Sequence, residues 1–549
     1  MLEQLASLHE SLTGRGLMAT EGYEFARIQW GLDLGPDGTA EGLVRLDAPD
    51  GKGARLLEIP AHGLRTSNVK PMYLCDSAPY LLGSGGARAR RCFQAAAKLH
   101  HELLDGSEDQ DAGLVLAFFD QGPQGAGLQE ATDPAVWRSA MIGSIVLCRG
   151  GQPLTDSPAL RRAWDQAMAG SQEEGPDSGK AQSLVSARIV SPVRSHPKIK
   201  GLPGGEGMGS SLVSAAPESS WSYGKQRGLV SPVGDQEATA YADALNYMLA
   251  TPGWHAPIGR AASVVCWSDD ADPRYPDALL HQAGLRQTPP PEDADGLDES
   301  MPCHVMALSS AKGRAIVLMH EDASYGRMRS RLRRTASDMT GDEDGPAPDM
   351  GRILDSLGDQ EQGLAVAMLR TMFAGGPYPA GLPRLVEEDI RRAGDVSGTD
   401  AMLLRAYYAR RPDKACPHGI LGPGTHEDSD CLGYRLGRVY YMYAAQIRRL
   451  NSPGTFKPLL RQTLCSTAAR PSHGIPALDR RLRTSPSKAD RRWYLHLARA
   501  VTPVGDHYPD HLDAPARSAF YLGYKAQALA TIEAAGRRQG RGRKQAPAD

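Results

Sequence analysis

Apolar residues in the first 180 positions follow two different spacings, which predict short helices and strands. Leucines at positions 2, 5, 8 and 12 recur near helical spacing and predict an opening amphipathic helix. Between residues 28 and 46, apolar positions alternate on both sides of a Gly-Pro-Asp-Gly turn, which predicts a hairpin with a third strand at 57–59. The same reasoning predicts a helix at 93–104 and strands at 114–119 and 141–148. We therefore expect a mixed α/β region over residues 1–180.

Along the rest of the chain, the spacing changes from mixed to almost entirely helical. Residues 238–249 predict a helix, 263–267 a strand, and 305–308 with 315–319 two paired strands joined by a turn at 309–313. A helix is expected from Tyr325, and from Ile353 to Ala535 the apolar residues step by three or four, as in a helical bundle. The expected fold class is α+β. A mixed α/β N-terminal and central portion (1–180 and 181–340) precedes a C-terminal helical bundle (350–535) and a disordered basic tail (536–549).

The overall charge argues against a free-standing, strongly basic nucleic-acid binder. The 549 residues include 62 Lys and Arg against 64 Asp and Glu, a net charge of -2, so any such binding must come from local patches. The eight cysteines lack a paired spacing, which is typical of reduced intracellular thiols. Neither a secretory leader nor an apolar run of membrane-spanning length is found in the sequence. We expect a soluble, cytoplasmic protein with no membrane partner.

The segment from Ala187 to Arg227 is the main candidate for binding phosphates. It carries positive residues at 188, 194, 198, 200, 225 and 227 against Glu206 and Glu218, with a glycine-rich stretch and several hydroxyls. Glycines let the backbone approach a ligand, hydroxyls donate to phosphate oxygens and lysines neutralise them. A solvated, flexible connection would have a similar composition. The candidate nucleic-acid contacts are Arg194, Lys198, Lys200, Gly207, Gly209, Ser210 and Lys225.

Two other stretches are candidates of the same kind. The first contains Arg65, Ser67, Asn68 and Lys70, in which an asparagine can pair with base edges while the cations hold phosphates. The alternative is a polar turn capped by the asparagine. The second is the helix expected from Tyr325, whose arginines form either a phosphate-binding stripe or a solvated face. The candidate stripe residues are Arg327, Arg331 and Arg334.

The sequence offers no convincing catalytic, metal or cofactor site. The GGEGMGSS stretch lacks the Gly-Lys-Ser/Thr of a phosphate-binding loop, although a nucleotide-binding enzyme stays a rival interpretation. Cys416, His418, His426 and Cys431 lack the two-to-four spacing of a zinc knuckle and are better explained as loop residues. His100 falls on the apolar face of its helix and is expected to be a core or half-buried histidine. We expect no catalytic residue, no metal and no cofactor.

Four blocks of the sequence carry a resemblance to a known family. They are RTSNVKPMYLCDSAPYLLG (65–83), HPKIKG…GSSLVS…SYGK with the following ALNYML, HVMALSSAKGRAIVLMHEDASYGRM (304–328), and YRLGRVYYMYAAQ with FYLGYKAQ. In this order, they resemble the large subunit of the subtype I-C CRISPR Cascade surveillance complex. The resemblance covers most of the chain, from about residue 1 to 535.

The resemblance implies a non-catalytic recognition subunit. In such a complex a guide crRNA reads the target by base pairing, while protein reads a short flanking motif, the protospacer-adjacent motif (PAM), in double-stranded DNA. Arg65, Ser67, Asn68 and Lys70 would form one PAM-proximal set, and Lys198, Lys200 and the 204–210 loop a second. The subunit would help open the duplex and hold the displaced strand. The implied partners are the RNA-processing and backbone Cascade subunits, a nuclease–helicase, and a small subunit made by internal translation, for which Met402 is a candidate start. A scaffold without any nucleic-acid role is the other rival interpretation.

Overall fold

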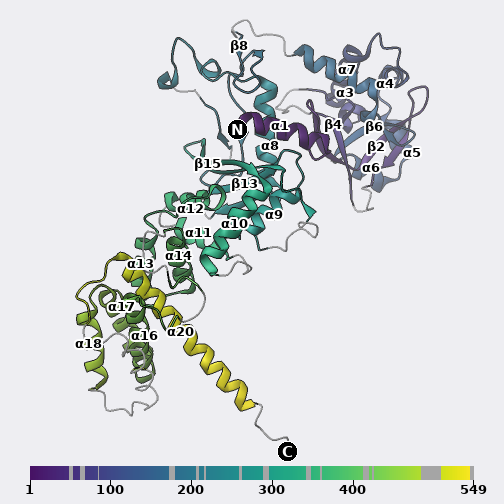
Figure 1. The fold of residues 1–549 in the computed structure, drawn as a ribbon. Coiled ribbons are helices and arrows are strands. Elements are labelled where there is room, and N and C mark those ends of the chain that lie inside the picture. Colours follow the sequence, from purple (N-terminus) through teal and green to yellow (C-terminus); the bar gives the residue numbers. More distant parts are fainter. Residues whose placement is uncertain are drawn as a thin grey trace, which may run out of the picture. The chain divides into compact units, whose positions relative to one another are not determined.

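The computed structural model describes most of the chain. The described residues are 1–47, 53–61, 69–84, 86–171, 180–205, 209–214, 218–258, 262–287, 296–341, 348–358, 362–411, 419–422, 426–483, 497 and 508–543. They group into two compact units, which can be followed by sequence colour in Figure 1. We call Leu2–His196 with Ala215–Ala244 the N-terminal unit, and Pro197–Ser214 with Leu245–Asp549 and Met1 the C-terminal unit. Helix α8 (Asp235–Ala250) begins in the first and ends in the second.

A small mixed sheet forms the centre of the N-terminal unit. Its strands are ordered β3-β2-β6-β5, with β7 paired to β6, and β2 and β6 run parallel. The expected hairpin is present as β2 and β3, while the expected third strand belongs to β4, which pairs with β1 in a separate ladder. A short ladder of β8 and β9 follows. The strands are β1 (Tyr23–Ile28), β2 (Trp30–Leu34), β3 (Ala40–Arg45), β4 (Arg55–Pro60), β5 (Cys75–Ser77), β6 (Ser144–Arg149), β7 (Gln152–Pro153), β8 (Ala181–Gln182) and β9 (Ile189–Val190).

Helices surround this sheet and share an aromatic core with it. Trp30 and Leu32 of β2 pack in one buried cluster with Phe93 and Phe118 of the helices. The helices are α1 (Leu2–Gly14), α2 (Ala78–Leu81), α3 (Ala87–Leu104), α4 (Gln110–Asp120), α5 (Gly125–Ala131), α6 (Pro134–Ala140) and α7 (Pro158–Ser171). The opening helix and the helix expected at 93–104 are thus confirmed.

The strand expected at 114–119 is wrong, because these residues belong to helix α4. Asp109 caps the helix by accepting hydrogen bonds from the backbone N–H groups of Asp111 and Ala112. Its buried residues lie on one broad face, but the partly buried Leu116 and Ala117 between them make the apolar run continuous and hide the helical period. A short apolar run of this kind is ambiguous between a buried strand and a buried helix.

His100 of α3 is a core histidine, as expected, and is fully buried. Its Nδ1 lies 2.7 Å from the carbonyl oxygen of Ala96, and its Nε2 lies 3.0 Å from the backbone nitrogen of Leu74. Because a carbonyl only accepts and an N–H only donates, Nδ1 carries the proton and Nε2 accepts. Burial lowers the pKa of His100 to about 4, so the ring is neutral.

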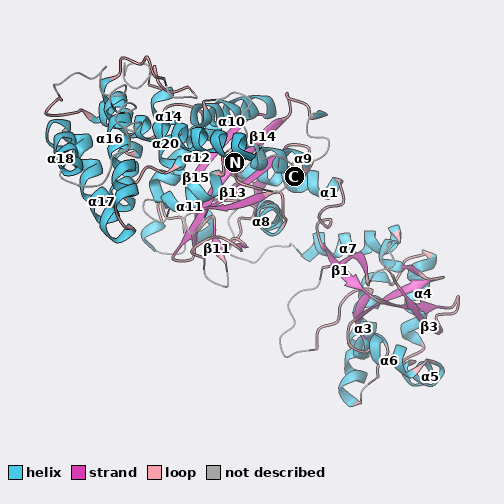
Figure 2. Cartoon of the chain, turned by 90° about the horizontal axis from the view of Figure 1, so that it is seen from below, coloured by secondary structure: helices cyan, strands magenta, loops and turns pink. Residues whose placement is uncertain are grey.

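The C-terminal unit is organised around a six-stranded sheet with the order β10-β11-β15-β14-β13-β12 (Figure 2). Every pairing is antiparallel except that of β11 with β15. Alternate residues of β13, β14 and β15 point to one face, where they join the core formed with helices α9 to α12. The strands are β10 (Lys198–Ile199), β11 (Ser210–Ser211), β12 (His255–Ile258), β13 (Ala262–Ser268), β14 (Pro302–Ala311) and β15 (Arg314–Ser324).

The hairpin of β14 and β15 is longer than the sequence predicted. Only Lys312 and Gly313 separate the strands, and both have positive φ, 52° and 71°. This is the type I′ geometry that suits the twist of a two-residue hairpin. The expected turn at 309–313 is therefore too wide, because Ser309, Ser310 and Ala311 still belong to β14. The helix expected from Tyr325 begins there, with the Ser324 side chain as its cap.

Helices continue from this sheet to the end of the described chain. Apolar residues of the sheet and of these helices belong to one buried cluster, so the central and C-terminal parts share a core. Helix α20 includes part of the basic stretch expected as a tail, and Met402 lies inside α14. The helices are α9 (Arg274–Gln282), α10 (Tyr325–Thr340), α11 (Met350–Gly358), α12 (Gln362–Ala374), α13 (Leu382–Ala393), α14 (Gly398–Ala409), α16 (Leu432–Leu450), α17 (Pro453–Ala469), α18 (Pro471–Arg483) and α20 (Ala514–Arg543).

Glycines let α16 and α20 cross with their backbones in close approach. A Cβ on Gly433 would lie 2.2 Å from the Ala516 carbonyl oxygen, and one on Gly437 would lie 1.9 Å from that of Phe520. Gly523 of α20 is equally close to α16 in return. Gly437 and Gly523 lie in the YRLGRVYYMYAAQ and FYLGYKAQ blocks, and Gly433 directly precedes the first block. The two blocks therefore meet at one helix crossing.

Most of the described cysteines are free thiols, as the sequence predicts, but one is not. Cys75, Cys92, Cys148, Cys266, Cys303 and Cys465 are buried and free, whereas Cys431 is disulfide-bonded. Cys416 and His418, half of the rejected zinc cluster, lie outside the described residues. Among the described helices, none is both long enough and apolar enough to cross a membrane.

Candidate nucleic-acid interface

The two lysines of the central segment lie on the edge strand of the six-stranded sheet. Lys198 and Lys200 are both exposed, at and just after β10. Asn246 of α8 fixes this backbone: its Oδ1 accepts from the Lys200 N–H at 2.8 Å, and its Nδ2 donates to the Lys198 carbonyl at 3.1 Å. The Lys198 ammonium donates to the Ser211 hydroxyl of β11 at 2.7 Å. Hydrogen bonds therefore hold the backbone that carries both lysines.

The β14–β15 hairpin adds two more cations to the same place. Lys198 pairs with Ser211, and Ser211 pairs with Arg314 at the start of β15, so the three lie in one row across neighbouring strands. With strands about 4.8 Å apart, the backbones of Lys198 and Arg314 are about 10 Å apart. Lys312 lies in the hairpin turn, next to the Gly313 carbonyl that accepts from the Ser211 N–H at 2.9 Å. We call Lys198, Lys200, Lys312 and Arg314 the basic corner.

The basic corner has an uncompensated positive charge. All four side chains are exposed, and none forms an ion pair with a described residue. Four unpaired cations within reach of one another suit a chain of phosphates, since each phosphate oxygen accepts from an ammonium or guanidinium group. Lys312 and Arg314 were missed in the sequence, because more than 100 residues separate them from Lys198. Only the pairing of β11 with β15 brings them together.

The glycine-rich stretch shapes the corner. Gly209 has a φ of 82°, and a Cβ there would lie 2.8 Å from the Ile199 carbonyl oxygen. Ser210 is fully buried, and its hydroxyl bonds that of Ser310 at 2.5 Å, so its side chain faces the hairpin and not the surface. Gly207 lies outside the described residues. In the described part of this stretch, Gly209 and Ser210 hold the segment against β14 and β15 and leave ligand contacts to the cations.

The 65–70 stretch is described only at its end. Arg65, Ser67 and Asn68 lie outside the described residues. Lys70 is exposed, and its backbone N–H donates to the buried Tyr80 hydroxyl of α2 at 3.1 Å. Helix α3 follows with three exposed arginines that form no ion pair with a described residue. They are Arg88, Arg90 and Arg91. We did not predict them as contacts from the sequence, although the run ARARR contains all three.

A comparison with protein families identifies the chain. The model of the family described as "CRISPR-associated protein (Cas_Csd1)" matches residues 3–532. The chain belongs to this family. A search of curated proteins found no match. Membership makes it a CRISPR-associated, Cascade-type protein that works with other Cas subunits.

Other candidate contacts of this Cas_Csd1 protein lie in the N-terminal unit. Arg194 and Lys225 are both exposed there. Lys225 pairs with Ser222 across a two-residue turn of Tyr223 and Gly224, both with positive φ. The Tyr223 side chain is 97% exposed at the tip of this turn. An exposed aromatic ring beside a lysine can stack on a nucleic-acid base, which the sequence analysis did not consider.

The arginines of α10 divide between the surface and the interior. Arg327, Arg333 and Arg334 are exposed. Arg331 instead points inward, donating to the Glu321 carboxylate at 2.8 Å and to the Phe373 carbonyl at 2.7 Å. It ties α10 to β15 and to the end of α12. Of the three candidate stripe residues in the Cas_Csd1 chain, Arg327 and Arg334 remain available to a ligand.

Proposed function

We propose that this Cascade-type protein is the large subunit of a subtype I-C surveillance complex, and that it binds the PAM-containing double-stranded DNA. The observation that carries the proposal is the basic corner. It presents four cations without a described ion pair, from β10 and the residue after it and from the β14–β15 turn and the start of β15, in a protein whose net charge is close to neutral. A local cationic surface on a neutral chain favours a defined nucleic-acid contact over indiscriminate binding.

The proposal divides the contacts into two kinds. The basic corner would hold phosphates, which positions the duplex without reading its sequence. Base reading would fall to the 65–70 stretch, with Asn68 as its sensor, while Lys70 and the α3 arginines would hold phosphates. Tyr223, next to Lys225, would stack on an unpaired base once the duplex opens and so help hold the displaced strand. The guide crRNA, the RNA-processing and backbone subunits, the internally translated small subunit and the nuclease–helicase would be its partners.

We propose that the subunit is not an enzyme and that cleavage belongs to the nuclease–helicase. In support, the glycine-rich stretch lacks the Gly-Lys-Ser/Thr of a nucleotide-binding loop, and in its described part Gly209 and Ser210 pack against the sheet. The competing function is a scaffold without DNA contact.

The test uses the reconstituted complex and two short duplexes that differ only in the flank beside the guide match. One carries the functional motif and the other a randomised flank; binding is titrated by gel shift for wild type, Asn68→Ala and Lys198→Ala/Lys200→Ala. We expect wild type to discriminate the flanks, Asn68→Ala to bind both equally, and the double variant to discriminate but bind both more weakly. A wild type that binds without discriminating, with the double variant unaffected, would support the scaffold instead.

A further inference from the structure

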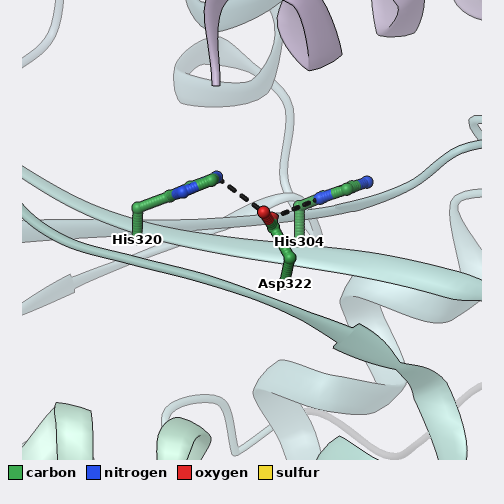
Figure 3. A group of neighbouring side chains, drawn as sticks. All are labelled: His304, His320 and Asp322. Atoms are coloured by element: carbon green, nitrogen blue, oxygen red, sulfur yellow. Dashed lines mark hydrogen bonds and ion pairs between the residues drawn. The ribbon is translucent and has the colours of Figure 1, made fainter.

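Two neighbouring strands, β14 and β15, bring two histidines and an aspartate together away from the basic corner. In the sheet register, Trp267 of β13 lies opposite His304 of β14, and His304 lies opposite Asp322 of β15. His320 precedes Asp322 by two residues on the same strand, so both side chains point to the same face of the sheet. Figure 3 shows His304 and His320 converging on the carboxylate of Asp322.

The donor atoms of this cluster are close enough to share one ligand. His304 Nδ1 lies 2.6 Å from Asp322 Oδ1, and His320 Nε2 lies 3.1 Å from the same oxygen. The three donor atoms all lie within 4.8 Å of one another. His320 Nε2 is buried yet forms no hydrogen bond, because its approach to Asp322 has the wrong direction for one. This ring nitrogen is thus directed into the cluster, where it lies at ion-pair distance from Asp322 without a hydrogen bond.

The surroundings of the cluster resemble those of a metal centre. His304 Nε2 lies 2.8 Å from Asp269 Oδ1, so a carboxylate holds the nitrogen that would not bind the ion and fixes the ring's orientation. The Trp267 ring stacks on His304 with centroids 4.9 Å apart and also covers His320 at 6.4 Å. His304 is only 6% exposed, whereas Asp322 is 45% exposed. The site is sheltered on one side and open to solvent on the other.

We propose that His304, His320 and Asp322 bind a divalent transition-metal ion, with Zn²⁺ as the preferred one. Two imidazoles and one carboxylate are a donor set that Zn²⁺ accepts, and three protein ligands leave a coordination position free. Asp269 is the positioning residue behind His304. This site goes beyond the proposed function, which needs no metal.

Only small movements separate the described arrangement from a coordinated one. With bonds of about 2.0–2.1 Å, neighbouring ligand atoms in a tetrahedral site lie about 3.3 Å apart. The His304–Asp322 contact would open by less than 1 Å, and His320 would turn toward the others. An ion bound in this way links β14 to the end of β15, immediately before α10 begins. Its free position faces the solvent side of Asp322, where a water or an oxygen of a ligand can complete the coordination.

The test is metal binding by the untagged, chelator-treated chain, since a histidine tag would bind the same ions. Zn²⁺ is titrated by calorimetry, and Co²⁺ is used as a spectroscopic probe whose visible bands report coordination by nitrogen and oxygen. We expect about one equivalent bound tightly. His320→Ala and, separately, Asp322→Asn should abolish the tight site, and Asp269→Asn should weaken it by about 10- to 100-fold.

His101→Ala is the matched control. His101 also lies between two aspartates, 2.8 Å from Asp105 and 3.1 Å from Asp120, but both ring nitrogens of its neighbour His100 are bonded to backbone groups in the core. This variant should bind Zn²⁺ as wild type does. Circular dichroism and the melting temperature without metal establish that each variant is folded. Absence of a tight equivalent in wild type, or its retention in the folded His320→Ala and Asp322→Asn variants, would overturn the proposal. Sulfur-to-cobalt charge-transfer bands would place the ion on cysteines and overturn it as well.

Discussion

Removing charge from the basic corner should change how DNA binding depends on salt. The perturbation is Lys198→Ala with Lys200→Ala, which leaves Lys312 and Arg314 in place. Both lysines are exposed, and their backbone contacts with Asn246 do not involve the side chains. The double variant should therefore fold like wild type and lose the two charges, together with the hydrogen bond from Lys198 to the Ser211 hydroxyl.

The size of the effect follows from the number of cations. Each cation that neutralises a phosphate of duplex DNA contributes about 0.9 to the slope of log K against log salt, so the four cations contribute about 3.6. Raising the salt from 50 to 200 mM should therefore weaken the wild-type contribution of these four cations to binding by about 150-fold. In the double variant, the two remaining cations contribute about 1.8 to the slope, and the same rise in salt should weaken their contribution by only about 12-fold.

The assay is fluorescence anisotropy with the reconstituted complex and a labelled duplex at several salt concentrations. The matched control is Lys98→Ala with Lys457→Ala, which removes the same charge from two exposed lysines on α3 and α17. The control should keep the wild-type slope. The reasoning is refuted if the corner variant keeps the wild-type slope, or if the control loses as much.

Two further predictions concern the folding of the chain. Because the folded pKa of His100 is about 4 while an unfolded histidine titrates near 6.5, only the unfolded chain gains a proton in mild acid. Because of His100, the free energy of unfolding should therefore be about 2 kcal/mol lower at pH 5 than at pH 8. Urea unfolding at both pH values should show a smaller difference for His100→Phe, and an equal one would contradict the assignment. Gly437→Ala should lower the melting temperature, since its Cβ would meet the Phe520 carbonyl oxygen at 1.9 Å and cost about 1–3 kcal/mol. Gly454→Ala, where the space is open, should leave it unchanged or raise it.

Local pattern was sufficient for many of the elements. The helix beginning at Tyr325, the strand at 263–267 and the N-terminal hairpin depend on spacing, capping and turn residues that neighbour one another in the chain. The prediction failed at 114–119, where the apolar run of helix α4 includes partly buried as well as buried residues, so its helical period is hidden. The prediction also made the turn at 309–313 too long, because Ser309 and Ser310 are polar although they lie in a buried strand.

The sequence by itself determined the α+β class, the resemblance to a CRISPR-associated family and the basic character of the central segment. The tertiary structure alone decided which charges act together. Lys198 and Arg314 became neighbours through the pairing of β11 with β15, and Arg331 turned inward to Glu321. His304 and Asp322 are neighbours for the same reason, because the register of β14 and β15 places them opposite each other. The period of a helix or a strand can be recognised within a few consecutive residues. A binding surface or a metal site instead combines residues that are far apart in the chain, and their spacing in the sequence does not show that they are neighbours. Long-range pairing is set by the packing of the whole core, and so only the folded chain reveals it.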